Sequence, residues 1–77
     1  MHTDTEFLDL RGLKCPLPAL MSRRALRRLG PGARITVTTD DPMAPIDIPH
    51  MCRNEGLEMV EMVRSGEAAT MVLRNPS

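Results

Sequence analysis

The chain has 77 residues, of which 42% are hydrophobic and 26% charged, and its formal net charge is zero. A chain of this length has room for one domain with one modest core, and the composition is that of a globular protein, which excludes a disordered or collagen-like chain. No apolar run reaches the roughly 18 residues of a membrane helix, and the N-terminal residues lack the pattern of a signal peptide. We therefore expect a cytoplasmic protein without a membrane partner.

The first half of the chain predicts a strand, a helix and a second strand. After a flexible tail over residues 1–4, residues 5–10 alternate in polarity as a strand does. Residues 16–29 predict an amphipathic helix that ends at Gly30, and the β-branched residues 33–39 favour a strand. The helix residues expected to face the core, spaced by three and four, are Leu17, Leu20, Met21, Ala25 and Leu29.

The next segment contains three prolines and is harder to interpret. Asp41 is a good helix N-cap, and Asp41 is expected to act as a cap rather than in chemistry. Because a proline inside a helix removes a hydrogen bond, we predict an irregular or short helical turn over residues 42–47 and a proper helix from about Pro49 to Glu55. The side chains expected to point inward are Ile48, Met51 and Cys52.

Two strands close the domain. Residues 57–64 and 68–74 are predicted to pair as an antiparallel hairpin through a turn at Ser65, Gly66 and Glu67. The element order βαβαββ requires a right-handed crossover and a parallel pair between the first two strands. We therefore predict one α/β (α+β) two-layer sandwich over residues 5–74, in which two helices cover one face of a mixed four-stranded sheet, followed by a tail over residues 75–77.

The other face of this sheet is predicted to be open. Glu58 or Glu61 is expected to lie on it, and it could serve as a partner surface. A small neutral domain of this kind is expected to be monomeric.

Cys15 stands where the first helix begins, directly before Pro16 and close to Pro18. The N-terminus of a helix carries partial positive charge, and Arg11 and Lys14 add charge on the same loop, so we expect a modestly lowered pKa for the thiol. The prolines lack backbone N–H groups, so little capping is needed and the thiol is free to face a partner. The alternative is a small buried cysteine with a packing role only.

This segment carries a resemblance. The sequence LDLRGLKCPLPAL is followed by an Asp-Asp-Pro and an Asp-Ile-Pro element and by the closing hairpin, and over residues 7–74 it resembles the TusA/SirA-like family of small sulfur carriers. The family pattern is Cys-Pro-x-Pro just after Arg-Gly-Leu. The positions matching this motif and its immediate surroundings are Arg11, Gly12, Lys14, Cys15, Pro16 and Pro18.

The resemblance implies a sulfurtransferase-type carrier that acts stoichiometrically and needs no cofactor. Cys15 would accept sulfane sulfur as a persulfide from a cysteine desulfurase or a rhodanese and pass it to an acceptor protein, in tRNA thiolation, molybdenum cofactor synthesis or sulfur metabolism. Arg11 and Lys14 would steady the anionic persulfide. Better-known members often carry an acid between the two prolines, where this sequence has Leu17.

Charge is segregated along the chain, since every charged residue between Leu10 and Thr39 is basic. The arginines of the first helix are the candidate surface for partner docking. They are Arg23, Arg24, Arg27 and Arg28. The alternative function is an RNA-binding or regulatory module that uses this helix, but the pI of about 6.7 and the single aromatic residue, Phe7, do not suit direct nucleic-acid binding.

Cys52 is expected to be a buried structural thiol, with a redox partnership with Cys15 as the alternative. A metal site built from Cys15, His50 and Cys52 does not match a usual zinc spacing, so no metal is expected.

Overall fold

The computed structural model describes residues 5–76, which form four strands and two helices in the predicted order βαβαββ. The strands are β1 (Thr5–Asp9), β2 (Arg34–Thr39), β3 (Glu58–Ser65) and β4 (Ala68–Arg74), and the helices are α1 (Leu17–Leu29) and α2 (Ala44–Glu55). The predicted two-layer fold with a mixed sheet is confirmed. No helix within residues 5–76 is long and apolar enough to cross a bilayer.

The sheet has the strand order β1-β2-β4-β3. β1 and β2 are parallel, with Leu8 opposite Val37, whereas β4 is antiparallel to both of its neighbours. In a parallel pair the carboxyl ends of the two strands lie at the same edge of the sheet. The loop that follows β1 and carries Cys15 therefore meets the loop that follows β2.

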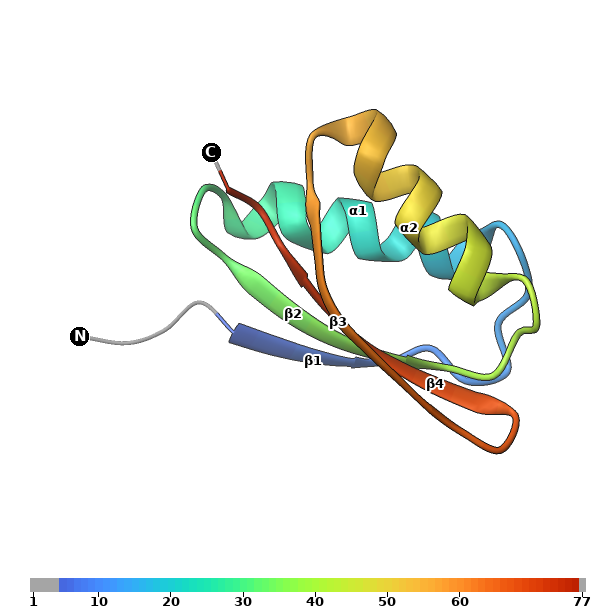
Figure 1. Cartoon of the computed structure of the whole chain (residues 1–77). Coiled ribbons are helices and arrows are strands. Elements are labelled where there is room, and N and C mark those ends of the chain that lie inside the picture. The colour runs from blue at the N-terminus through green and yellow to red at the C-terminus, as the bar shows by residue number, and fades with distance from the viewer. Residues whose placement is uncertain (1–4, 77) are drawn as a thin grey trace.

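Both helices cover the same face of the sheet (Figure 1). The core between the layers contains Ile35 and Met71 from the central strands, Leu26 from α1 and Ile48 from α2, all fully buried. On the opposite face, Glu58 and Glu61 lie opposite the half-buried Arg74 and Val72. This agrees with the prediction that acidic residues of β3 lie on the open face.

The predicted core stripe of α1 is wrong at three of its five positions, whereas Ala25 is buried and Leu29 packs against the core. Leu17, Leu20 and Met21 are each more than 40% exposed. The residues that α1 buries are Pro18, Ala19, Ser22, Ala25 and Leu26. These positions also recur at helical spacing, and they suit close packing because Ala19 and Ala25 are small and the Ser22 hydroxyl donates to the Pro18 carbonyl at 2.7 Å.

Helix α2 is longer than predicted, because it runs from Ala44 to Glu55 without a break although Pro49 lies inside it. The proline removes one hydrogen bond to the carbonyl of Pro45. Burial of Ala44, Ile48 and Cys52 on one face compensates for this loss. The expected N-cap also shifts, since the Asp41 carboxylate accepts the backbone N–H of Met43 just before the helix.

The hairpin is tighter than predicted, because Ser65 pairs with Ala68 and only Gly66 and Glu67 form the turn. A bulge at Met59–Glu61 shifts the register of β3, so that Met59 and Met62 both pack against the core. Of the predicted tails, residues 1–4 and 77 lie outside the described residues. Asn75 is buried, and its backbone N–H donates to the Ala33 carbonyl at 2.9 Å.

Candidate functional site

Cys15 lies at the end of the loop between β1 and α1, and its side chain is exposed. Backbone hydrogen bonds shape this loop, from Leu13 to the Leu10 carbonyl and from Leu17 to the Lys14 carbonyl. Gly12 has a φ of +86°, a conformation that L side chains rarely adopt. The Cys15–Pro16 peptide bond is cis.

The start of α1 has no side-chain cap, as the two prolines predict. Pro18 lies in the first turn without an N–H to satisfy, and the N–H of Leu20 donates to the Pro16 carbonyl at 3.1 Å. The Cys15 thiol is therefore not bound back to the helix and is available to another group.

That other group is Asp47, in the first turn of α2. The Cys15 Sγ lies 2.6 Å from Asp47 Oδ2 and donates its hydrogen to this carboxylate. Asp47 is half-buried, and its own backbone N–H donates to the Met43 carbonyl at 2.8 Å. The hydrogen bond joins the loop before α1 to the first turn of α2, although 32 positions separate the two residues in the sequence.

The expectation of a lowered thiol pKa is wrong. The hydrogen bond to Asp47 raises the pKa of Cys15 above its usual value of 9.0, and desolvation and the negative charges of Asp47 and Asp41 add to the increase. The carboxylate holds the thiol in its protonated form because ionisation would place two negative charges side by side. The sequence shows the basic residues Arg11 and Lys14 on the loop that carries the thiol. It does not show that the fold places the acidic residue Asp47 beside that thiol.

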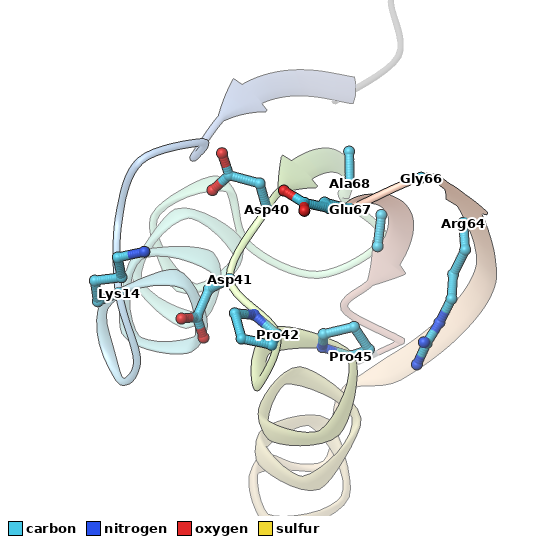
Figure 2. Close-up of a pocket in the computed structure, with 10 residues that line it drawn as sticks. Lys14, Asp40, Asp41, Pro42, Pro45, Arg64, Gly66, Glu67 and Ala68 are labelled. Atoms are coloured by element: carbon cyan, nitrogen blue, oxygen red, sulfur yellow. The ribbon is translucent and has the colours of Figure 1, made fainter.

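The two cations of the loop do not contact Cys15. Arg11 forms two hydrogen bonds of 2.8 Å to the carboxylate of Asp9, and both side chains are about 60% exposed. Lys14 instead projects toward a shallow pocket of about 450 Å³ (Figure 2). Other charged groups around this pocket are Asp40, Asp41, Arg64 and Glu67, from the loop after β2 and from the hairpin.

The arginines of α1 are largely engaged within the chain. Arg27 donates to the carbonyl and the carboxylate of Glu55 at 2.7 and 3.0 Å, and Arg23 lies 3.6 Å from the same carboxylate. Arg28 donates to Glu6 at 2.6 Å. Arg24 is exposed and forms no ion pair with another residue of the described chain. These contacts are at the surface, where ion pairs are weak and exchange readily.

Exposed apolar side chains lie on the elements that meet at the Cys15–Asp47 pair. We call these residues the apolar collar. They are Leu17, Leu20 and Met21 from α1, and Met43 and Ile46 from the start of α2. Their exposed fractions range from 42% to 60%. This surface was not predicted, because Leu17, Leu20 and Met21 were expected to lie in the core.

Cys52 differs from Cys15 in its exposure and its surroundings. It is 2% exposed, it packs in the core, and burial raises the pKa of its thiol to about 11. This agrees with the prediction of a buried thiol. Within residues 5–76, no group of three His, Cys, Asp or Glu side chains is arranged to hold a metal ion.

Residues 6–75 match the family described as sulfurtransferase TusA. The sulfur carrier protein TusA of Pseudomonas aeruginosa is 40% identical over 60 residues, which cover 78% of this chain and 76% of that one. The chain belongs to the TusA family of sulfur carriers.

Two further likenesses cover nearly the whole chain. A proposed sulfur carrier protein of Neisseria meningitidis is 35% identical over 72 residues, which cover 94% of this chain and 97% of that one. The crystal structure of a SirA-like protein from Desulfitobacterium hafniense superposes with a TM-score of 0.80 at 22% identity, over 94% of this chain and 99% of that one. The latter likeness shows the fold.

One residue of the site, Asp47, is missed by reasoning from the sequence. In the sequence, Asp47 belongs to the Asp-Ile-Pro element, and nothing there assigns it a role. The available signal is a carboxylate two residues before a helical proline, in a chain whose cysteine lies at the start of another helix. Only the parallel pairing of β1 with β2 and the packing of α2 bring the two residues together.

Proposed function

We propose that the protein carries sulfur as a persulfide on Cys15. The observation that supports this most directly is the contrast between the two thiols: Cys15 is exposed in the segment that matches the TusA family, whereas Cys52 is buried. A carrier needs a thiol that two different proteins can reach in turn. Only Cys15 meets that requirement within the described chain.

The proposed transfer is a sulfur exchange like thiol–disulfide exchange. The Cys15 sulfur attacks the outer sulfur of a donor persulfide, the donor's own thiol leaves, and the Cys15 persulfide is then attacked by a thiol of the acceptor. A cysteine desulfurase or a rhodanese is the proposed donor. The acceptor would act in tRNA thiolation, molybdenum cofactor synthesis or sulfur metabolism.

Features of the surface support a protein as the partner rather than a nucleic acid. The apolar collar offers area on α1 and at the start of α2 that a partner protein can bury. The arginines of α1 remain the proposed electrostatic part of this docking surface. RNA recognition would instead use aromatic side chains, and the single one, Phe7, lies on β1, away from α1 in sequence.

The test is sulfur loading followed by intact mass. The reduced protein is incubated with a cysteine desulfurase, pyridoxal phosphate and cysteine, and in parallel with a rhodanese and thiosulfate. We expect one added sulfur atom on the wild type and on Cys52→Ser, and none on Cys15→Ser. Loading of Cys15→Ser, or no loading of the wild type by either donor, would contradict the proposal. A binding assay with unspecific RNA at low salt tests the alternative, and we expect no binding.

A further inference from the structure

The contact between Cys15 and Asp47 has different consequences for the empty and the loaded carrier. In the empty state the thiol is neutral, and its hydrogen lies between Sγ and Asp47 Oδ2, which are 2.6 Å apart. A hydrogen bond from a neutral donor to a carboxylate is among the stronger kinds. Asp47 therefore stabilises the thiol form of Cys15.

The loaded state loses this contact. A persulfide is a stronger acid than a thiol, so at neutral pH the terminal sulfur is an anion and has no hydrogen to donate. Asp47 then faces a negative charge at close range, and Asp41 adds a second carboxylate from the loop before α2. Lys14, the residue before Cys15 in the chain, projects toward the pocket, and Arg11 is bound to Asp9.

From this geometry we propose that Asp47 biases Cys15 toward release of its sulfur, by stabilising the empty thiol and repelling the loaded persulfide. This inference rests on the proposed function and deepens it. A carrier must not keep its cargo, and a carboxylate beside the thiol makes transfer to an acceptor more favourable than it would be from an isolated cysteine. Asp47 touches the reacting sulfur and so acts directly on it.

The exchange with glutathione persulfide measures this bias without a partner protein. Cys15 attacks the outer sulfur of the glutathione persulfide anion, a new sulfur–sulfur bond forms on Cys15, and the bond within glutathione persulfide breaks. The electron pair of that bond remains on the glutathione sulfur, which takes the proton that Cys15 gives up. The products are glutathione and the Cys15 persulfide anion, so atoms and charge balance and no other oxidant is needed.

The experiment compares the ratio of loaded to empty protein at equilibrium, read by intact mass, at fixed ratios of glutathione persulfide to glutathione. We expect Asp47→Asn, which keeps the shape and loses the charge, to raise this ratio about fivefold to tenfold, as removal of one nearby like charge implies. Asp47→Glu keeps the charge and should stay nearer to the wild type. Glu61→Gln removes a charge from the open face of the sheet and should change nothing.

The outcomes separate this inference from the proposed function. If the wild type loads on Cys15 and Asp47→Asn has the same ratio or a lower one, the role of Asp47 is refuted and the carrier function stands. If Cys15→Ser gains sulfur as the wild type does, or if no variant loads, both proposals fail.

A second measurement excludes a purely structural role for Asp47, whose charge also suits the first turn of α2. The rate of Cys15 alkylation by iodoacetamide is followed against pH, with the modified residue identified by peptide mass. We expect the midpoint of the profile to move to lower pH in Asp47→Asn, whereas loss of a helix-stabilising charge alone would leave the midpoint in place.

Discussion

The carboxylate of Asp40 accepts a hydrogen bond of 2.9 Å from the backbone N–H of Gly12, so the loop after β2 holds the loop that carries Cys15. The two residues are 28 positions apart in the sequence. Because β1 and β2 are parallel, their following loops lie at one edge of the sheet and this bond can form. Asp40 thus belongs to the support of the site although it does not touch the thiol.

Replacing Asp40 by alanine should release the Gly12 amide. We expect the hydrogen-exchange rate of this amide, measured by NMR, to rise about tenfold, since hydrogen bonds to charged groups contribute on the order of 1.5–3 kcal/mol. Asp40→Asn keeps an oxygen acceptor at the same place and should retain most of the protection. Equal protection of Gly12 in the wild type and in Asp40→Ala would show that the bond does not hold the loop in solution.

Two isoleucines on α2 give a matched test of the core and the surface. Ile48 is fully buried, and Ile46, two residues away, is 60% exposed. We expect Ile48→Ala to lower the free energy of unfolding by about 2–5 kcal/mol because it leaves a cavity, and Ile46→Ala to change it by less than about 0.5 kcal/mol. Urea denaturation of both variants measures the difference. Equal losses would mean that Ile46 belongs to the core and not to the apolar collar.

The sequence predicted the order of the elements, the mixed sheet and the exposure of Cys15, because these depend on local patterns and on the chirality of the crossover. It could not identify the buried face of α1. Two sets of residues recur at helical spacing there, and the more hydrophobic set, with Leu17, Leu20 and Met21, is the exposed one. Hydrophobicity alone favours the larger side chains, whereas close packing selected Ala19, Ser22 and Ala25.

The chemistry of the site depends on contacts between residues that are distant in the sequence. Positive charge close to Cys15 in the chain predicted a more acidic thiol. In the folded protein Arg11 is bound to Asp9, and Asp47 arrives from α2 to accept the thiol hydrogen. Pro49 was expected to interrupt the helix and to keep residues 42–47 outside it. Because of this error, the sequence did not show that Asp47 has a fixed place in the first turn of α2.

The electrostatic part of docking is tested at Arg24, which has no ion pair to lose within the described chain. Arg24→Gln should slow sulfur loading from a protein donor severalfold at low salt, with the difference vanishing at high salt, because surface charges act mainly on the encounter rate. Loading from glutathione persulfide should be unchanged. Arg34→Gln, at an exposed position of β2, is the matched control. The same rate for both variants would remove Arg24 from the docking surface.

Cys52 should make stability fall at high pH. Burial raises the pKa of this thiol from 9.0 to about 11 in the folded protein, so the folded state favours the neutral form. Its contribution is fully present below pH 9, where the thiol is neutral in both states, and is lost as pH rises toward 11 and the unfolded chain ionises first. A shift of this size corresponds to about 2 kcal/mol by pH 11.

Because other groups of the protein also ionise as pH rises, the measurement is a difference. The free energy of unfolding of the wild type and of Cys52→Ala is determined by urea denaturation, under reducing conditions, from pH 8 to pH 11. The alanine variant loses packing by the same amount at every pH, but it has no buried thiol to ionise. We expect its stability to approach that of the wild type as pH rises, whereas parallel curves would show that Cys52 is not held neutral by its surroundings.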